Sequence, residues 1–514
     1  MGQVPRSAAW LEDQFNIQNE RSQTMKRNIA PLNRAGRWLG TGYMIKPNNL
    51  FQRLAGNLPG VLLWLAVLPL AALGQANYAT PYTFITIAGK AGNSGSTDGT
   101  NSTARFNQPV GVAVDTNGNL YVPEVGNNTI RTVKPVGTSW VVTTVAGLAG
   151  HPGSADGTNS AARFNFTINV GGLNYIGCGP AVDSAGNVYV PDAGNNTIRK
   201  ITPVGTNWVV TTLAGKAGVS GSVDGTNSAA RFYCPWGLAV DTNGSIYVAE
   251  GFNNTIRKVT PDGTNWVVTT LAGKAGVSGS ADGTNSAARF YFPAYPGLDR
   301  AGNVYVPDEG NQTIRKVTPD GTNWVVTTLA GKAGVSGSAD GTNSAARFYY
   351  PDQVAVDSAG TLYDTDSESS TIRKIAPVGT NWVVTTVAGL AGSVGSLDGT
   401  GSAARFNFGP GAGGAVAMDS AGNLYVPDYV NNTIRKGMPA SSVPPPILQP
   451  PSLNAGLFGF GITGLPGLAV TIQSSTNLSS WQLITTFVLV GGTNYYSVSP
   501  DLSLGAQFYR AHAR

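Results

Sequence analysis

A unit of about 58 residues recurs six times along this chain, and this repeat constrains the fold more than any other feature. Residues 261–291 and 319–349 are identical, so two neighbouring units have barely diverged. An Asp-Gly pair marks each unit, at Asp98, Asp156, Asp224, Asp282, Asp340 and Asp398, and an Ile-Arg pair follows it, at Ile130, Ile198, Ile256, Ile314, Ile372 and Ile434. Repeats of this kind usually form stacked modules, because one unit cannot bury its apolar face alone.

Each unit contains four segments with the composition of β-strands. In the third unit these are residues 237–241 (GLAVD), 245–250 (SIYVAE), 255–261 (TIRKVTP) and 266–273 (WVVTTLAG). Val, Ile, Thr and aromatic residues favour strands, and the connecting D-x-x-G and P-D-G-T-N sequences favour tight turns. The repeat region shows no helical periodicity. Six copies of a four-stranded unit predict an all-β fold, a six-bladed β-propeller.

The two ends of the repeat region complement each other. WVVTT-type fourth strands begin at Trp140, Trp208, Trp266, Trp324 and Trp382, and the sixth unit ends without one. A matching segment, TFITIAG at residues 83–89, precedes the first unit. We therefore expect the N-terminal strand to complete the last blade and close the ring, which pairs an otherwise open sheet edge.

The repeated series ARF–P–GLAVD–GN–YV–D–N–TIRKVTP–G–TTLAG resembles the NHL-repeat family, in the longer form of teneurin-type NHL propellers. The resemblance covers residues 83–438 and is carried by all six units. It implies a six-bladed propeller that serves mainly as a binding or spacing module, with some lyase relatives.

The first 76 residues are predicted to lie outside the propeller. Residues 61–73 (VLLWLAVLPLAAL) are too short and too interrupted by proline for a transmembrane helix, and Gly74-Gln75-Ala76 follows, as in a secretory signal cleaved after Ala76. A start at Met44 would give a signal of ordinary length. This predicts an exported protein, periplasmic, cell-surface or secreted. The alternative is an uncleaved membrane anchor at residues 58–74, the one membrane contact we expect.

The positive charge is confined to this N-terminal extension. Residues 1–56 hold eight Lys and Arg against three Asp and Glu, which accounts for the net charge of +5. The remainder is close to neutral and has no basic stripe, so nucleic acid is not an expected partner.

Two further segments follow the propeller, which we place at residues 77–439. Residues 440–452 form a Pro-rich linker. Residues 453–514 again have the composition of strands and predict a small β-sandwich-like domain. Its S-T-N-L-x-x-W…F-Y-R pattern resembles a C-terminal module of exported proteins from verrucomicrobial-type bacteria.

The residues that usually carry catalysis are scarce. Only two histidines are present, His151 and His512, whereas the lyase relatives use propeller histidines for metal binding and proton transfer. Known nucleophile, phosphate-loop and zinc motifs are missing from the sequence. An Asp opens the turn after the first strand of every unit, at Asp115, Asp183, Asp241, Asp299, Asp357 and Asp419, and a sixfold copy indicates a structural role. We expect no enzyme activity and no cofactor.

Function is better sought where the units differ. Units two and six carry insertions just before the first strand, after Arg163 and Arg405. This point should lie on the entry face, where the connections between blades enter the inner strands. The candidate ligand-binding residues there are aromatic in units three to five (Tyr233, Trp236, Tyr291, Tyr295, Tyr349 and Tyr350) and amides in the others (Asn107, Asn165 and Asn407).

Aromatic platforms with neighbouring amides suit a glycan or an extended peptide, so we expect an extracellular glycan or protein as partner, bound by a monomer. The alternative for the aromatic residues is that they fill the seams between blades. Two other functions stay open: a lyase or hydrolase with carboxylates in the central channel, and a purely structural spacer.

Two further sites follow from single departures. Unit five has Asp364, Asp366 and Glu368 in alternation, a weak candidate for calcium. Cys178 and Cys234, the only cysteines, fall in corresponding segments of neighbouring units, so a disulfide is plausible in an oxidising compartment. Two free thiols are the alternative.

Overall fold

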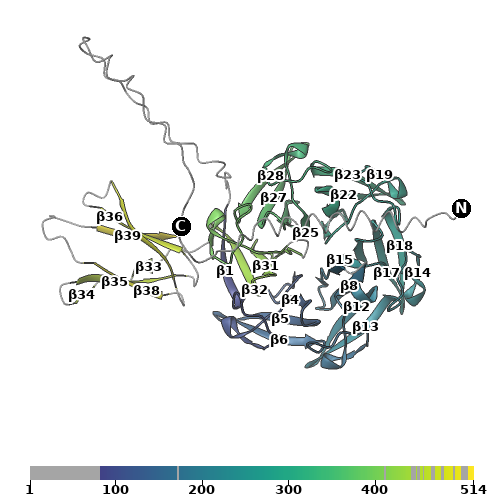
Figure 1. Ribbon diagram of the computed structural model, residues 1–514, viewed down its shortest axis with the longest axis horizontal. Coiled ribbons are helices and arrows are strands. Elements are labelled where there is room, and N and C mark those ends of the chain that lie inside the picture. The colour runs from purple at the N-terminus through teal and green to yellow at the C-terminus, as the bar shows by residue number, and fades with distance from the viewer. Residues whose placement is uncertain are drawn as a thin grey trace, which may run out of the picture. The chain divides into compact units, whose positions relative to one another are not determined.

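The computed structural model describes residues 81–440 except 171–172 and 410–412, together with separate stretches of the C-terminal part. Six five-stranded antiparallel sheets follow one another along the first of these regions. They surround a common centre, each forming one blade of a propeller (Figure 1). The helices of the described residues are short 3-10 turns, and none of them is long and apolar enough to cross a membrane.

The sheets have the following strands. The first blade comprises β2 (Gly99–Thr100), β3 (Ala113–Val114), β4 (Leu120–Glu124), β5 (Thr129–Val136) and β6 (Ser139–Ala146). The second comprises β7 (Gly157–Thr158), β10 (Ala181–Val182), β11 (Val188–Asp192), β12 (Thr197–Val204) and β13 (Asn207–Gly215). The third comprises β14 (Gly225–Thr226), β15 (Pro235–Val240), β16 (Ile246–Glu250), β17 (Thr255–Asp262) and β18 (Asn265–Gly273).

The fourth blade comprises β19 (Gly283–Thr284), β20 (Gly297–Leu298), β21 (Val304–Asp308), β22 (Thr313–Asp320) and β23 (Asn323–Gly331). The fifth comprises β24 (Gly341–Thr342), β25 (Pro351–Val356), β26 (Leu362–Asp366), β27 (Thr371–Val378) and β28 (Asn381–Ala388). The sixth comprises β29 (Gly399–Thr400), β30 (Ala417–Met418), β31 (Leu424–Asp428), β32 (Thr433–Pro439) and β1 (Tyr82–Gly89).

The short turns lie in the loops. The 3-10 helices are η1 (Asn101–Thr103), η2 (Asn159–Ala161), η3 (Ala193–Asn195), η4 (Asn227–Ala229), η5 (Asn285–Ala287), η6 (Glu309–Asn311), η7 (Asn343–Ala345) and η8 (Gly401–Ala403). The insertion of the second unit forms a hairpin of its own, β8 (Thr167–Val170) with β9 (Leu173–Ile176).

Each blade contains the four strands that the repeat predicts and one that it does not. The additional strand is the Gly-Thr of the Asp-Gly loop, which pairs with the outer long strand; in the fourth blade Gly283 lies opposite Val326. Two residues are too few to show a periodic pattern, so the sequence did not reveal this strand. It binds the loop that arrives from the preceding blade to the outer edge of the next sheet.

The N-terminal strand closes the ring as predicted. β1 is antiparallel to β32 along its length, with Tyr82 opposite Pro439 and Gly89 opposite Thr433. The Tyr82 hydroxyl donates to the Gly422 carbonyl oxygen at 3.2 Å, which ties β1 to the turn of the sixth blade. The N-terminal strand and the last unit therefore form one sheet.

The hydrophobic core is divided among the six seams between neighbouring blades. Inside each blade, a buried arginine of the third long strand joins two carboxylates. Arg315 lies 2.6 Å from Asp308 of β21 and 2.8 Å from Asp282 of the Asp-Gly loop, and its guanidinium covers the Phe290 ring at 5.2 Å. The same arrangement occurs around Arg131, Arg199, Arg257, Arg373 and Arg435. These landmark residues are thus structural.

The described C-terminal strands form two further sheets. One contains β33 (Ile447–Leu448), β34 (Ser452–Asn454), β35 (Leu457–Thr463) and β38 (Thr493–Val498), and the other contains β36 (Ala469–Ser475), β37 (Gln482–Val488) and β39 (Phe508–Ala513). One core cluster joins Phe460 and Ile462 of β35 to Val470 and Ile472 of β36. The two sheets therefore share a hydrophobic core.

Several predictions concern residues outside the described part of the chain. These are the signal segment 61–73, the cleavage site after Ala76, the alternative anchor at 58–74 and most of the Pro-rich linker 440–452.

Candidate functional site

The centre of the entry face is filled by Tyr295, which follows the loop into the fourth blade. Its side chain is 3% exposed, and its hydroxyl accepts a hydrogen bond from the Cys178 backbone N–H at 3.4 Å. A Cβ atom at Gly179 or Gly237 would lie 2.8 Å or 2.4 Å from the Tyr295 ring, and one at Gly413 would lie 3.3 Å from its hydroxyl. Tyr295 thus contacts the second, third and sixth blades. Side chains at these three glycine positions would leave no room for the Tyr295 ring.

Trp236 fills the next space in the same way. It is 6% exposed, and its ring lies 5.5 Å from Phe292 and 6.4 Å from Phe252. A Cβ atom at Gly177, in the insertion of the second unit, would lie 2.1 Å from the indole. Very little of Trp236 or Tyr295 is left for a ligand, and both pack in the seams that the sequence analysis gave as the alternative.

The other predicted binding residues are only partly buried. Tyr233, Tyr291 and Tyr349 occupy one position in three consecutive blades, and Asn107, Asn165 and Asn407 occupy it in the others. At this position the backbone N–H donates to the acidic residue that ends the second long strand, as Tyr291 does to Asp308 at 2.7 Å. The backbone is therefore fixed, while the side chain can vary. Tyr350 follows Tyr349 and stacks on it, with ring centroids 5.4 Å apart.

Both cysteines are free and buried, so the structure contradicts the proposed disulfide. Their backbones are held by different groups: Cys178 donates to the Tyr295 hydroxyl, and Cys234 donates to the Asn196 side chain at 2.9 Å. Burial raises the pKa of the Cys178 thiol well above its ordinary value. The two residues serve as small apolar groups in the packed entry face.

The acidic run of the fifth unit is a strand and a tight turn. Asp366 lies 3.0 Å from Arg373 and is the acidic partner that every blade supplies to its buried arginine. Asp364 replaces a valine found in the other five blades, for example Val306. The described residues contain no cluster of three or more His, Cys, Asp or Glu side chains suited to a metal ion, so the calcium candidate with Glu368 gains no support.

Asp364 is a buried acid without a hydrogen bond. The carboxyl is fully buried, and neither oxygen has a hydrogen-bond partner of ordinary geometry, although the Asp352 backbone N–H approaches it. Burial, followed by the neighbouring Asp366 and Asp352 carboxylates, raises the pKa of Asp364 well above its ordinary value. The buried Asp364 carboxyl therefore lowers the stability of the folded protein.

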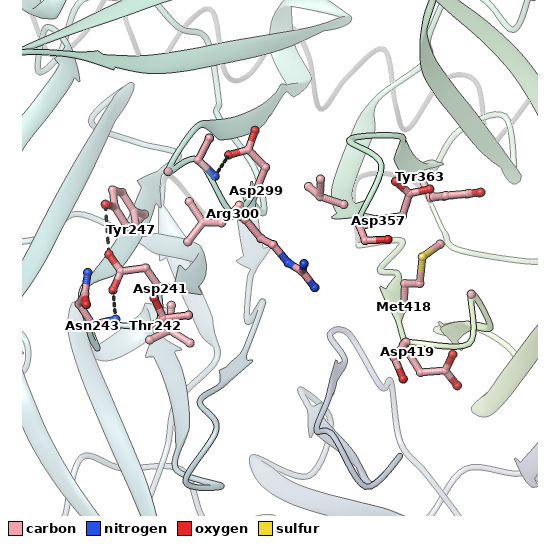
Figure 2. Close-up of a pocket in the computed structure, with 18 of the residues that line it drawn as sticks. Asp241, Thr242, Asn243, Tyr247, Asp299, Arg300, Asp357, Tyr363, Met418 and Asp419 are labelled. Carbon is pink, nitrogen blue, oxygen red and sulfur yellow. Dashed lines mark hydrogen bonds between the residues drawn. The ribbon is translucent and has the colours of Figure 1, made fainter.

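The opposite end of the propeller, the turn face, carries the D-x-x-G turns and contains a cavity of about 1140 Å³. The turns of four consecutive blades, three to six, line it, beginning at Asp241, Asp299, Asp357 and Asp419. Figure 2 shows these turns around a shared space. A cavity of this size accommodates a ligand of several rings.

The turn aspartates hold their own turns, which explains why every blade has one. Asp299 accepts hydrogen bonds from the Ala301 and Asn303 backbone N–H groups, each at 2.9 Å, through Oδ1. Its Oδ2 accepts from the Asn303 side chain at 2.7 Å and from the Tyr305 hydroxyl at 3.0 Å. Each oxygen of this carboxylate therefore has two partners.

The two blades beside the fourth have lost part of this arrangement. The Asn of the turn is replaced by Ser245 in the third blade and by Thr361 in the fifth. Asp241 Oδ2 keeps only a 3.4 Å contact from the Tyr247 hydroxyl. Asp357 Oδ2 accepts no hydrogen bond from any described residue, and the hydroxyl of its tyrosine, Tyr363, is hydrogen-bonded to the Tyr82 hydroxyl at 3.2 Å.

A single arginine projects into this cavity. Arg300 occupies a turn position that is Thr or Ser in the other five blades, and it is exposed. It forms no ion pair with any described residue within 4.0 Å. Its guanidinium points toward the side of the cavity where Asp357 and Asp419 lie (Figure 2). The cavity thus combines an arginine that has no ion pair among the described residues with two incompletely bonded carboxylates, Asp241 and Asp357; Lys258 also lines it.

A signal for this cavity is present in the sequence, in the turns at the end of each unit opposite to the insertions and the aromatic residues. The turn of the fourth unit reads DRAGN, and the units beside it read DTNGS and DSAGT. Three departures in consecutive blades at one end of the repeat would have indicated a shared surface.

The comparisons with known proteins agree with the fold. Residues 208–397 match the family model of the teneurin NHL domain, and residues 106–132 match that of the NHL repeat. No curated protein matches the chain.

Solved structures resemble the chain at low identity. A protein of unknown function from Bacteroides thetaiotaomicron has 22% identity and a TM-score of 0.51, over 70% of this chain and 76% of that one. An auxiliary nutrient binding protein from Bacteroides ovatus has 21% identity and a TM-score of 0.49, over 70% and 77%. A streptogramin B lyase has 13% identity and a TM-score of 0.41, over 70% and 99%. The likeness to the first of these shows a shared fold.

The family matches fall on units with four long strands and a buried arginine, in a ring that its own N-terminal strand completes. Residues 208–397 are therefore similar to the teneurin NHL domain, and residues 106–132 are similar to an NHL repeat.

Proposed function

We propose that this protein is a non-enzymatic binding module that holds a glycan in the cavity of its turn face. The observation that carries this proposal is Arg300, an exposed cation in a cavity of about 1140 Å³ where every other blade has Thr or Ser. The cavity is polar and is framed by turns on a rigid ring, and such loops are where recognition residues usually sit.

The carboxylates of this cavity support binding better than catalysis. In all four turns Oδ1 of the aspartate accepts two backbone hydrogen bonds, as in Asp241 from Asn243 and Ser245, both at 2.9 Å. A group with this role in every blade is part of the scaffold. A carboxylate-based hydrolase or lyase in the same channel is the alternative, and product formation from a bound saccharide would reveal it.

We also propose export, on the strength of the apolar segment 61–73 and the small residues that follow it. A glycan ligand suits an exported protein. N-terminal sequencing of the mature protein, with a start at Asn77, would support this part of the proposal.

A second binding surface is proposed for a protein partner at the rim of the entry face. Tyr233, Tyr291 and Tyr349 are half-buried there in three consecutive blades, and aromatic side chains of this kind are frequent in protein interfaces. The packed centre of the entry face favours contact over its rim and leaves little room for a ligand at this end of the channel.

The test is a binding screen of neutral and acidic oligosaccharides by calorimetry, followed by a variant that obstructs the cavity. Ser358→Trp adds a large ring to an exposed turn position of the cavity. Ser184→Trp makes the same change in the second blade, whose turn does not line this cavity. We expect Ser358→Trp to abolish binding and Ser184→Trp to preserve it. Equal binding by both variants would reject the turn face as the site.

A further inference from the structure

The chemistry of the turn-face cavity specifies more than a polar ligand. Arg300 belongs to the fourth blade, and the two incompletely bonded carboxylates, Asp241 and Asp357, belong to the blades on either side of it. The turn that carries the cation thus lies between the two turns whose aspartates can accept further hydrogen bonds. This inference rests on the proposed function and concerns the ligand of the same site.

The carboxylates have capacity for donors from a ligand. An ionised carboxylate only accepts hydrogen bonds and has room for about four of them. Asp299, in the fourth blade, receives four within its own turn. Asp357 receives two, both at Oδ1, from the Ala359 and Thr361 backbone N–H groups at 2.8 Å. Its Oδ2 is therefore available for a hydroxyl group.

The replacement of the turn asparagine has no evident benefit for the turn itself. Ser245 and Thr361 still donate their backbone N–H groups to Asp241 and Asp357, at 2.9 Å and 2.8 Å, but they do not supply the side-chain amide. In the fourth blade this amide, from Asn303, donates to Oδ2 of the turn aspartate at 2.7 Å. A ligand that donates to these oxygens would replace what the turn has lost.

Arg300 adds the second requirement, an anion. Its guanidinium has five N–H donors in a planar fork that matches a carboxylate, and it stays charged at any physiological pH. The nearby carboxylates do not neutralise it at ion-pair distance, as shown above. A ligand for this site therefore carries a carboxylate between groups that donate hydrogen bonds on both sides.

We infer that the ligand is a uronate-bearing saccharide, whose carboxylate binds Arg300 and whose hydroxyls donate to Asp241 and Asp357. A sugar acid presents hydroxyl donors on both sides of its carboxylate. This matches an arginine in the fourth blade and accepting aspartates in the third and fifth. A zwitterion such as an amino acid carries its N–H donors on one ammonium group, whereas a saccharide carries hydroxyl donors at several positions.

The experiment compares one saccharide in two charge states. Calorimetry measures binding of trigalacturonate and of its methyl ester, which has the same hydroxyls and no carboxylate charge. We expect the wild-type protein to bind the acid at least about tenfold more tightly, since a hydrogen-bonded ion pair has this strength. Equal affinities, or no binding of trigalacturonate, would overturn the inference.

Variants of Arg300 and Asp357 test whether these residues cause the preference for the acid over its methyl ester. Arg300→Thr, the residue type of other blades, should remove the preference for the acid. Lys332→Thr, a change of the same charge at an exposed loop position, should preserve it. Asp357→Asn should weaken both forms of the saccharide, and Asp183→Asn, the same change in the second blade, should weaken neither. A preference that persists in Arg300→Thr contradicts the assignment.

The outcomes separate this inference from the proposed function. If Ser358→Trp abolishes binding of a saccharide but Arg300→Thr leaves its affinity unchanged, the cavity is the site and the acid requirement is wrong. If trigalacturonate binds equally well to Ser358→Trp, the turn face is not the site, and both proposals fail. Tighter binding of an amino acid than of trigalacturonate would replace the saccharide with a zwitterion.

Discussion

The two ends of the propeller's channel differ in how they use the residues that vary among blades. On the entry face, the variable residues Trp236 and Tyr295 are buried and fill the centre of the ring. On the turn face, the variable residue Arg300 lines a cavity. The variable residues Ser245 and Thr361 leave the aspartates of their turns, Asp241 and Asp357, with fewer hydrogen bonds than Asp299 has. A residue that departs from the repeat therefore does not by itself indicate a binding site. A closed ring also needs irregular side chains to fill its centre.

The largest expected effect is on the entry face, where Tyr295→Ala should lower the free energy of unfolding by about 3–5 kcal/mol. The substitution leaves a cavity between Gly179, Gly237 and Gly413, whose backbones are fixed by the ring. Chemical denaturation would measure the loss.

Tyr349→Ala is the control, since this tyrosine is only partly buried at the rim. We expect a smaller loss from it. Equal losses from the two variants would show that the centre of the entry face is not closed by packing.

An intermediate effect, of opposite sign, is expected at Asp364. Asp364→Val installs the residue of the other five blades and should raise the free energy of unfolding at pH 7 by about 1–3 kcal/mol, because it removes a buried carboxyl without hydrogen bonds. Val306→Asp, the reciprocal change in the fourth blade, should lower it.

The gain from Asp364→Val should depend on pH. Because the pKa of Asp364 is raised in the folded protein, the folded state binds this proton more tightly than the unfolded chain does. The stabilisation of the folded state by this bound proton is fully present below the pKa of Asp364 in the unfolded chain, about 4. It is lost as the pH rises toward the pKa of Asp364 in the folded protein. The groups that face Asp364 are Asp352, Asp366 and Arg373. Denaturation at pH 4 and pH 7 should show the larger gain at pH 7, and the reverse order would contradict the assignment.

The smallest effect on stability is expected on the turn face. Arg300→Thr should change the free energy of unfolding by less than about 0.5 kcal/mol, because the side chain is exposed and unpaired within the described structure. A loss above 1 kcal/mol, on the order of a structural hydrogen bond, would mean that Arg300 serves the fold, and the contrast between the faces would weaken.

The fold followed from the sequence to a large extent, because strand composition and turn residues recur in every unit. The pairing of β1 with β32 was predicted from a strand missing at one end of the repeat and present at the other. The two-residue strands such as β19 were not, since pairing through Gly283 and Thr284 leaves no periodic signal.

The candidate site was less predictable for a physical reason. Sequence position placed Tyr295 and Trp236 near the entry face but could not give their depth, which depends on glycines in other blades, such as Gly179 and Gly237. Tyr363, whose counterpart Tyr305 donates to the turn aspartate of the fourth blade, is hydrogen-bonded to the Tyr82 hydroxyl, about 280 residues earlier in the sequence. Contacts of this range are not visible in a repeat pattern.

Amide hydrogen exchange, measured by mass spectrometry with and without trigalacturonate, tests most directly which face binds. The account predicts slower exchange in the turns at residues 241–245, 299–303 and 357–361, and no change in the entry loops that contain Tyr291 and Tyr349. Slower exchange confined to the entry loops would contradict it.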